Sequence, residues 1–113
     1  MNMNASIEPV LNASEIKEKA VEKLREVYDP EIPVNIYELG LIYDIDVRDD
    51  QSVLISMTLT SPACPVAGIL PGEVEAKIRS IPGVSDAVVE LVWEPQWTPN
   101  MMSEAAKLEL GFD

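Results

Sequence analysis

Residues 41–59, LIYDIDVRDDQSVLISMTL, decide the fold of this chain, because apolar and polar side chains alternate through two runs joined by a short turn. A period of two is typical of a strand that buries one face and leaves the other in water. The polar triplet Asp49-Asp50-Gln51 separates the two runs. Strands joined by so short a turn are antiparallel. The stretch therefore predicts a β-hairpin.

A helix is predicted before the hairpin, over about Ala13–Tyr28. Asn12 or Ser14 can cap its start, and Asn12 with Glu15 has the spacing of a capping box. The helix is expected to end at Asp29-Pro30, since a proline ring disfavours helical geometry in the preceding residue. Its buried stripe is predicted to comprise Ile16, Ala20, Leu24, Val27 and Tyr28.

The chain after the hairpin predicts a loop, a helix, a third strand and a last helix. The regular helix is expected over Glu73–Ser80, since Pro71-Gly72 disturbs the turn before it. The third strand is predicted over Val84–Trp93 and the last helix over Pro99–Leu110, while Val34–Leu39 has room for one helical turn. A strand–helix–strand crossover is right-handed and makes its two strands parallel.

This order of elements predicts the fold class α/β (α+β): a two-layer domain with a mixed three-stranded sheet and helices packed on one face, in the order α-β-β-α-β-α. Residues 1–12 are polar and unpatterned and are expected to form a flexible lead-in. Residues 13–113 are expected to form a single domain, because 113 residues suit one hydrophobic core.

The charge of the chain limits its partners. Twenty acidic residues against eight basic ones give a formal net charge of −12. Such a surface repels nucleic-acid phosphates and anionic bilayers, so neither is an expected partner. No apolar run approaches the roughly 20 residues that span a bilayer. The N-terminus has no Lys or Arg before Lys17 and no continuous apolar stretch, which predicts no secretory signal and a cytoplasmic location.

The chain has no His and one Cys. It therefore lacks a Ser-His-Asp or Cys-His nucleophile pair, an intramolecular disulfide and the four thiolates of a self-contained cluster site. We expect that the chain is not an enzyme and has no catalytic residues. Any metal chemistry must be shared with another chain or with a small thiol.

Cys64 is predicted in the loop between the second strand and the following helix. Unpaired N–H groups and the helix dipole at a helix start lower a thiol pKa and favour metal ligation. The hydroxyls of Thr60 and Ser61 could donate hydrogen bonds to its sulfur or to a sulfide. Alternatively, Cys64 is a small buried residue that packs beneath the loop.

Two further groups have alternative interpretations. Asp29 and Glu31 either present two carboxylates near the Cys64 loop or end the first helix on a solvated surface. The cluster of Trp93, Trp97, Met101 and Met102 either forms an apolar patch for a partner or a second copy, or pins the last helix to the sheet.

The acidic hairpin residues Asp44, Asp46, Asp49 and Asp50 do not fit a calcium loop. That pattern requires an acid or Asn where Arg48 stands and a Glu where Ile55 stands. They are predicted to form the wet face and turn of the hairpin.

Two motifs, DPEIPVNIYELGLI at 29–42 and TLTSPACP at 58–65, resemble the SufT-type members of the iron–sulfur cluster assembly domain family. That family also includes PaaD proteins, the eukaryotic cytosolic targeting factor and the N-terminal domain of some Mrp-type carriers. The resemblance covers about Ser14–Phe112. The ending VWEPQWTPNMMSEAAKLELG at 92–111 resembles the stand-alone SufT group, whereas the cysteine-rich tail of PaaD is missing.

The resemblance implies a maturation factor that helps to carry or target iron–sulfur clusters to apo-proteins. The reactive cysteine of the family falls on Cys64, its acidic motif on Asp29 and Glu31, and its hydroxyl residues on Thr60 and Ser61. The expected cofactor is a labile iron–sulfur cluster with Cys64 as a transient metal ligand or transfer contact. The expected partners are the assembly machinery and apo client proteins.

One thiolate per chain would hold a cluster weakly, which suits a carrier whose cluster must leave. A homodimer would supply a second thiolate. The alternative function is a metal-free adaptor that links the assembly machinery to its clients. A thiol enzyme is disfavoured, because the chain offers no His base and no resolving Cys.

Overall fold

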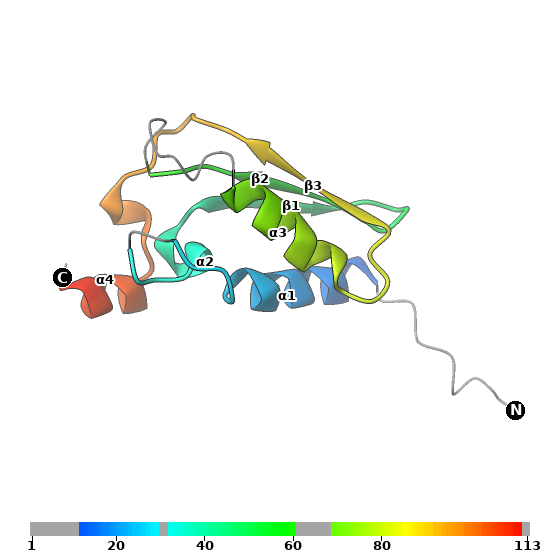
Figure 1. The fold of residues 1–113 in the computed structure, drawn as a ribbon, viewed down its shortest axis with the longest axis horizontal. Coiled ribbons are helices and arrows are strands. Elements are labelled where there is room, and N and C mark those ends of the chain that lie inside the picture. The colour runs from blue at the N-terminus through cyan, green and yellow to red at the C-terminus, as the bar shows by residue number, and fades with distance from the viewer. Residues whose placement is uncertain (1–11, 30–31, 61–68, 112–113) are drawn as a thin grey trace, which may run out of the picture.

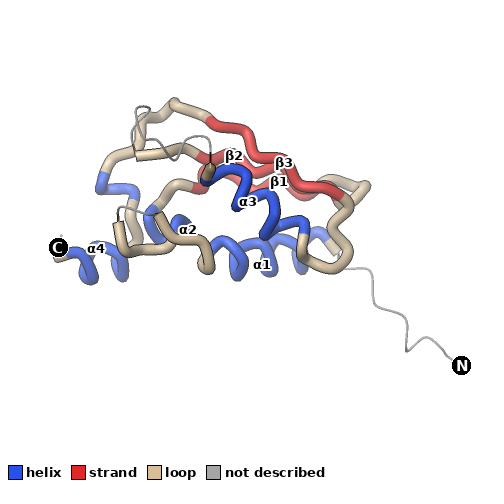
Figure 2. Tube along the Cα trace, in the orientation of Figure 1, coloured by secondary structure: helices blue, strands red, loops and turns tan. Residues whose placement is uncertain are grey.

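The computed structural model describes residues 12–29, 32–60 and 69–111. Its elements follow the chain in the order α1 (Ala13–Leu24), α2 (Ile36–Leu39), β1 (Ile42–Val47), β2 (Ser52–Met57), α3 (Leu70–Arg79), β3 (Asp86–Leu91), η2 (Pro99–Met101) and α4 (Glu104–Leu110). The three strands form one layer, and α1 and α3 lie together on one side of it (Figures 1 and 2). The predicted two-layer α+β fold is confirmed.

The sheet has the predicted mixed topology, with strand order β1-β2-β3. β1 and β2 are antiparallel and pair Ile45 with Ile55. β2 and β3 are parallel and pair Ile55 with Val89. The register shifts between Ile42 and Asp44, which marks an irregularity at the start of β1. All three strands are shorter at their ends than the alternation predicts.

The hydrophobic core lies between the sheet and the helices. The buried side chains of β2 alternate along the strand, as predicted, at Val53, Ile55 and Met57. Helix α1 contributes Ile16, Ala20 and Leu24, and α3 contributes Leu70, Val74 and Ile78. No helix within the described ranges is long and apolar enough to cross a membrane.

Helix α1 begins as predicted but ends earlier. Asn12 and Glu15 form both hydrogen bonds of a capping box. The helix stops at Leu24 rather than continuing to Tyr28, because the following backbone pairs with another segment: Val27 accepts the N–H of Ile36 at 2.8 Å. Tyr28 is consequently 58% exposed, so its assignment to the buried stripe is wrong.

The two later helices also differ from prediction at their boundaries. α3 starts at Leu70 because Pro71 lies in its first turn, where a missing N–H costs no intrahelical hydrogen bond. The predicted last helix is interrupted: Met102 is extended, and the Ser103 side chain caps a new helix by accepting the Ala106 N–H at 3.1 Å. Gly111, a residue type typical of a helix end, ends α4 in the left-handed conformation.

Candidate functional site

Thr60, one of the predicted site residues, lies just beyond the end of the sheet where β2 and β3 finish and β1 begins. Met57 pairs there with both Ile42 and Leu91. Thr60 follows the end of β2 and is half-buried. The carboxyl ends of parallel strands are a common place for binding sites in α/β sheets.

Backbone hydrogen bonds connect Asp29 to this same end of the sheet. The Asp29 N–H bonds to the Val34 carbonyl, which precedes α2. After α2, the Leu41 carbonyl accepts the Thr58 N–H at 2.8 Å. Asp29 and the Thr58–Thr60 segment are therefore both attached to α2 and its flanking residues.

Asp29 and Thr60 are the only predicted site residues that lie within the described ranges; Glu31, Ser61 and Cys64 lie outside them. Asp29 is only 5% exposed, and its carboxyl oxygen accepts the Ile32 N–H at 3.1 Å. A buried carboxylate requires such hydrogen bonds to offset its lost hydration. The solvated-surface interpretation is therefore wrong for Asp29.

Two polar residues at this end of the sheet, Tyr43 near the start of β1 and Thr58 just after β2, were not recognised as site residues from the sequence. The Tyr43 hydroxyl donates to the Pro95 carbonyl at 2.6 Å. Burial raises the pKa of Tyr43, and the negative charge of Glu94 acts in the same direction. Thr58 itself is buried, and its Oγ1 has no hydrogen-bond partner in the described part of the chain. The alternation of the strands assigns Tyr43 and Thr58 to a face of the sheet, but it does not predict the hydrogen bond between Tyr43 and Pro95.

The segment after β3 is anchored across α2 and β1. Trp97 donates its indole N–H to the Leu39 carbonyl at 2.9 Å, and Ser103 donates its N–H to the Glu38 carbonyl at 2.8 Å. Met102 is buried. Trp97 and Met102 therefore do not form an exposed patch, but these two hydrogen bonds fix the segment to α2 rather than to the sheet. Trp93 remains 40% exposed.

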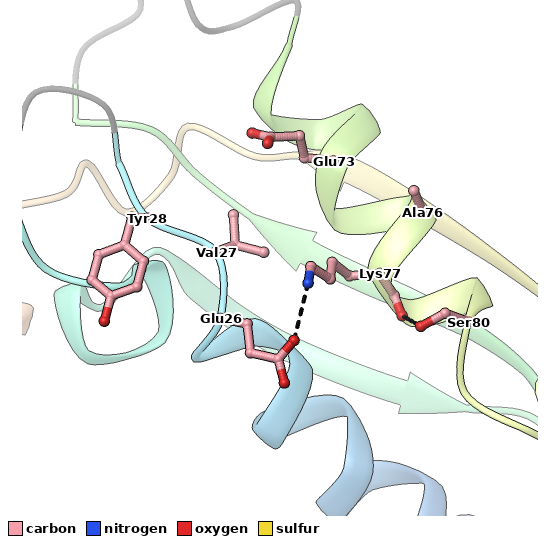
Figure 3. A pocket seen from close by; sticks show the side chains of 7 residues that line it. All are labelled: Glu26, Val27, Tyr28, Glu73, Ala76, Lys77 and Ser80. Atoms are coloured by element: carbon pink, nitrogen blue, oxygen red, sulfur yellow. Dashed lines mark hydrogen bonds and ion pairs between the residues drawn. The ribbon is translucent and has the colours of Figure 1, made fainter.

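A groove lies between residues 26–28 and α3, and we refer to it as the α1–α3 groove. Its volume is about 600 Å³. Figure 3 shows the Tyr28 ring on one side and Ala76 on the other, with Lys77 and Glu26 between them. The lining residues are Glu26, Val27, Tyr28, Glu73, Ala76, Lys77 and Ser80.

An ion pair spans this groove. Lys77 Nζ lies 3.0 Å from Glu26 Oε1. This hydrogen bond, with the charge of Lys23, lowers the pKa of Glu26. Within the described ranges, no group of three or more Asp, Glu, Cys or His residues is arranged to hold a metal ion. The acids of the hairpin are exposed as predicted, and Asp46 pairs with Arg48 at 3.3 Å.

The model of the iron–sulfur cluster assembly protein family matches residues 17–91. The chain belongs to this family. It is similar to the Fe-S protein maturation auxiliary factor of Porphyromonas gingivalis, with 52% identity over 96 residues that cover 85% of this chain and 91% of the relative. It is also similar to the Fe-S protein maturation auxiliary factor SufT of Staphylococcus aureus, with 41% identity, covering 75% of this chain and 97% of that protein.

The fold also matches a solved member. A crystal structure of a domain of unknown function, DUF59, from Bacillus anthracis has a TM-score of 0.82 and 36% identity, covering 88% of this chain and 95% of that chain. The resemblance to SufT-type members of the iron–sulfur cluster assembly family is confirmed. The family match spans every predicted site residue and stops at Leu91, before the anchored segment of Trp97 and Met102.

Proposed function

We propose that this chain helps to mature iron–sulfur proteins by carrying or targeting clusters to apo-proteins. The family match over residues 17–91 carries the proposal, because it includes both the acidic motif around Asp29 and the segment with Cys64. The names of the relatives, which describe maturation auxiliary factors, support the same role.

The chemistry of the donors favours a transient hold on the cluster. A cluster usually takes four thiolate ligands, and one chain supplies a single cysteine. In this proposal Cys64 is a transient ligand or the contact through which a cluster passes, and the other ligands come from a small thiol, a second copy or the partner. The iron–sulfur cluster is cargo, and the chain performs no catalysis.

The other site residues have supporting roles in the proposal. The carboxyl group of buried Asp29 is held in place by the Ile32 N–H, and Glu31 of the same motif supplies a second carboxyl group. Thr60 and Ser61 supply hydroxyl donors for the sulfur of Cys64. The partners are the assembly machinery and apo client proteins, and the place of action is the cytoplasm.

Anaerobic reconstitution with iron and sulfide tests the carrier role. Wild type and Cys64→Ser are compared by visible absorbance and iron content, with a small thiol present in both samples. Bands in the wild type that are lost in Cys64→Ser establish Cys64 as a ligand. No cluster in either protein would contradict the carrier role and favour a metal-free adaptor.

A second measurement tests the role in cells. The activity of an iron–sulfur hydro-lyase, relative to the amount of that enzyme, is measured in a strain that lacks the gene for this chain. Restoration by the wild type but not by Cys64→Ala is the expected result. Full restoration by Cys64→Ala would contradict both the ligand and the transfer-contact versions.

A further inference from the structure

We propose that the α1–α3 groove binds an extended segment of the client protein. In this segment an apolar residue stands next to a Lys or Arg of the same segment. The inference rests on the proposed function and adds to it the surface and the chemistry by which the partner is recognised. It is carried by the exposure, the charge and the position of the groove.

The walls of the groove expose apolar surface that the fold does not use. Tyr28 is 58% exposed although its neighbour Val27 is buried. Ala76 presents a methyl group from α3 on the opposite side (Figure 3). Exposed aromatic and aliphatic side chains beside a groove are typical of protein-binding surfaces.

Contacts fix both sides of the groove in place. Tyr28 forms a β-bridge with Asn35, so its backbone is fixed relative to α2. Lys77 joins α3 to Glu26 through the 3.0 Å ion pair. A surface ordered before binding loses less conformational entropy when a partner arrives.

The charge of the groove selects a basic segment. Among the described residues that line it, Lys77 is the only cation, and Glu26 neutralises it. Glu73 lies at the same groove and forms no ion pair with any described residue, so it is available to a Lys or Arg of the partner. A second copy is a poor occupant, since each chain carries a net charge of −12. An anionic ligand would meet the unpaired carboxylate of Glu73.

The position of the groove relates it to the predicted site. Tyr28 directly precedes Asp29, and α3 follows the segment that contains Cys64. A segment in the groove would therefore hold the rest of its protein beside both motifs. Docking of this kind would raise the local concentration of the client at the point of cluster transfer.

Matched pairs of variants test the proposal. Tyr28→Ala and Glu73→Lys alter the groove, whereas Leu108→Ala and Glu109→Lys make similar changes at exposed positions of α4. All four positions are exposed, and thermal unfolding verifies that each variant folds. The first readout is the hydro-lyase activity restored in cells. The second is the binding of a fluorescent 12-residue Gly-Ser peptide with two leucines flanked by lysines, compared with the same peptide carrying glutamates.

We expect each groove variant to weaken binding of the lysine peptide by about tenfold, as for a central interface residue. The groove variants are expected to lower the restored activity, the α4 variants to match the wild type in both readouts, and the glutamate peptide not to bind. Equal peptide binding by groove and α4 variants, equal binding of both peptides, or no binding of the lysine peptide would overturn the inference. Failure of the wild type to restore activity would instead contradict the proposed function, and the peptide data would still decide the docking question.

Discussion

The carboxylate of Glu75 accepts the backbone N–H of Val89 at 2.9 Å, so a side chain of α3 occupies a hydrogen-bond donor on the free edge of β3. Arg79 lies beside this contact, 3.7 Å from Glu75 and 3.0 Å from Asp86. Asp86 in turn accepts the Ala87 N–H at 2.8 Å. Two successive outward-facing donors of the edge strand are thus covered by carboxylates, which discourages pairing with another chain.

We predict that Glu75→Ala exposes the Val89 N–H to water. Its hydrogen exchange should become faster by about fivefold, and the free energy of unfolding should fall by about 1 kcal/mol, the usual contribution of one hydrogen bond. Glu75→Gln keeps an oxygen acceptor and should retain most of the protection. Unchanged exchange at Val89 in Glu75→Ala would contradict the edge contact.

The pKa of Asp86 is lowered, first by the Ala87 N–H and then by Arg79. Arg79→Met should raise this pKa but leave it below the ordinary value, because the larger cause remains. A carboxyl with a lowered pKa stabilises the fold above its unfolded-state pKa, about 3.9 for Asp, and that contribution is lost as the pH falls through the lowered value. An NMR titration of the Asp86 carboxyl carbon measures the shift. A pKa at or above the ordinary value in Arg79→Met would show that the Ala87 N–H is not the main cause.

Gly40 and Gly111 allow a comparison of two glycines with similar backbone conformations, of which only Gly40 has another residue close to the position of an added Cβ. Both have a positive φ, 88° and 83° respectively. A Cβ on Gly40 would meet the Met101 carbonyl oxygen, whereas a Cβ on Gly111 would have open space. Gly111→Ala should cost about 1 kcal/mol of stability from backbone strain alone.

Gly40→Ala should cost clearly more, about 3 kcal/mol, since the backbone near Met101 must also move. Chemical denaturation of the two variants provides the comparison. Equal losses of stability would mean that the backbone at Met101 moves away from residue 40 at little cost in free energy.

Thr58→Val removes a buried hydroxyl that has no hydrogen-bond partner in the described part of the chain. Stability should be unchanged or rise by up to about 1 kcal/mol, because an unsatisfied polar atom leaves the interior. Thr58→Ser keeps the hydroxyl and loses a methyl group, so it should cost about 1 kcal/mol. A marked loss of stability in Thr58→Val would show that the hydroxyl is satisfied in solution.

Local patterns predicted the elements whose stability comes from their own residues. The capping box of Asn12 and Glu15, the alternation of Val53, Ile55 and Met57, and the left-handed end at Gly111 all arise within a few residues. The parallel pairing of β2 and β3 followed from the handedness of the crossover. The boundaries were less predictable where distant segments compete: Val27 and Tyr28 leave the helix because Ile36 and Asn35 offer backbone partners.

At the candidate site, motifs identified some residues, but they did not predict how those residues are buried or which distant residues contact each other there. Asp29 and Thr60 were named from the sequence, but the burial of Asp29 was not, since it depends on the packing of the chain around it. Tyr43 and Pro95 are far apart in sequence, and no local pattern indicates their hydrogen bond. The same holds for the α1–α3 groove, whose two sides come from the segment after α1 and from α3.

The sequence by itself determined the order of elements, the mixed sheet and the membership of the iron–sulfur assembly family, because periodicity, capping and short motifs act between neighbouring residues. The tertiary structure alone decided that Tyr28 faces solvent, that Asp29 is buried and that Glu75 covers the edge of β3. These outcomes depend on which distant groups the packed fold brings within hydrogen-bond distance of a given backbone N–H or carboxylate. That competition is settled only when the helices pack on the sheet.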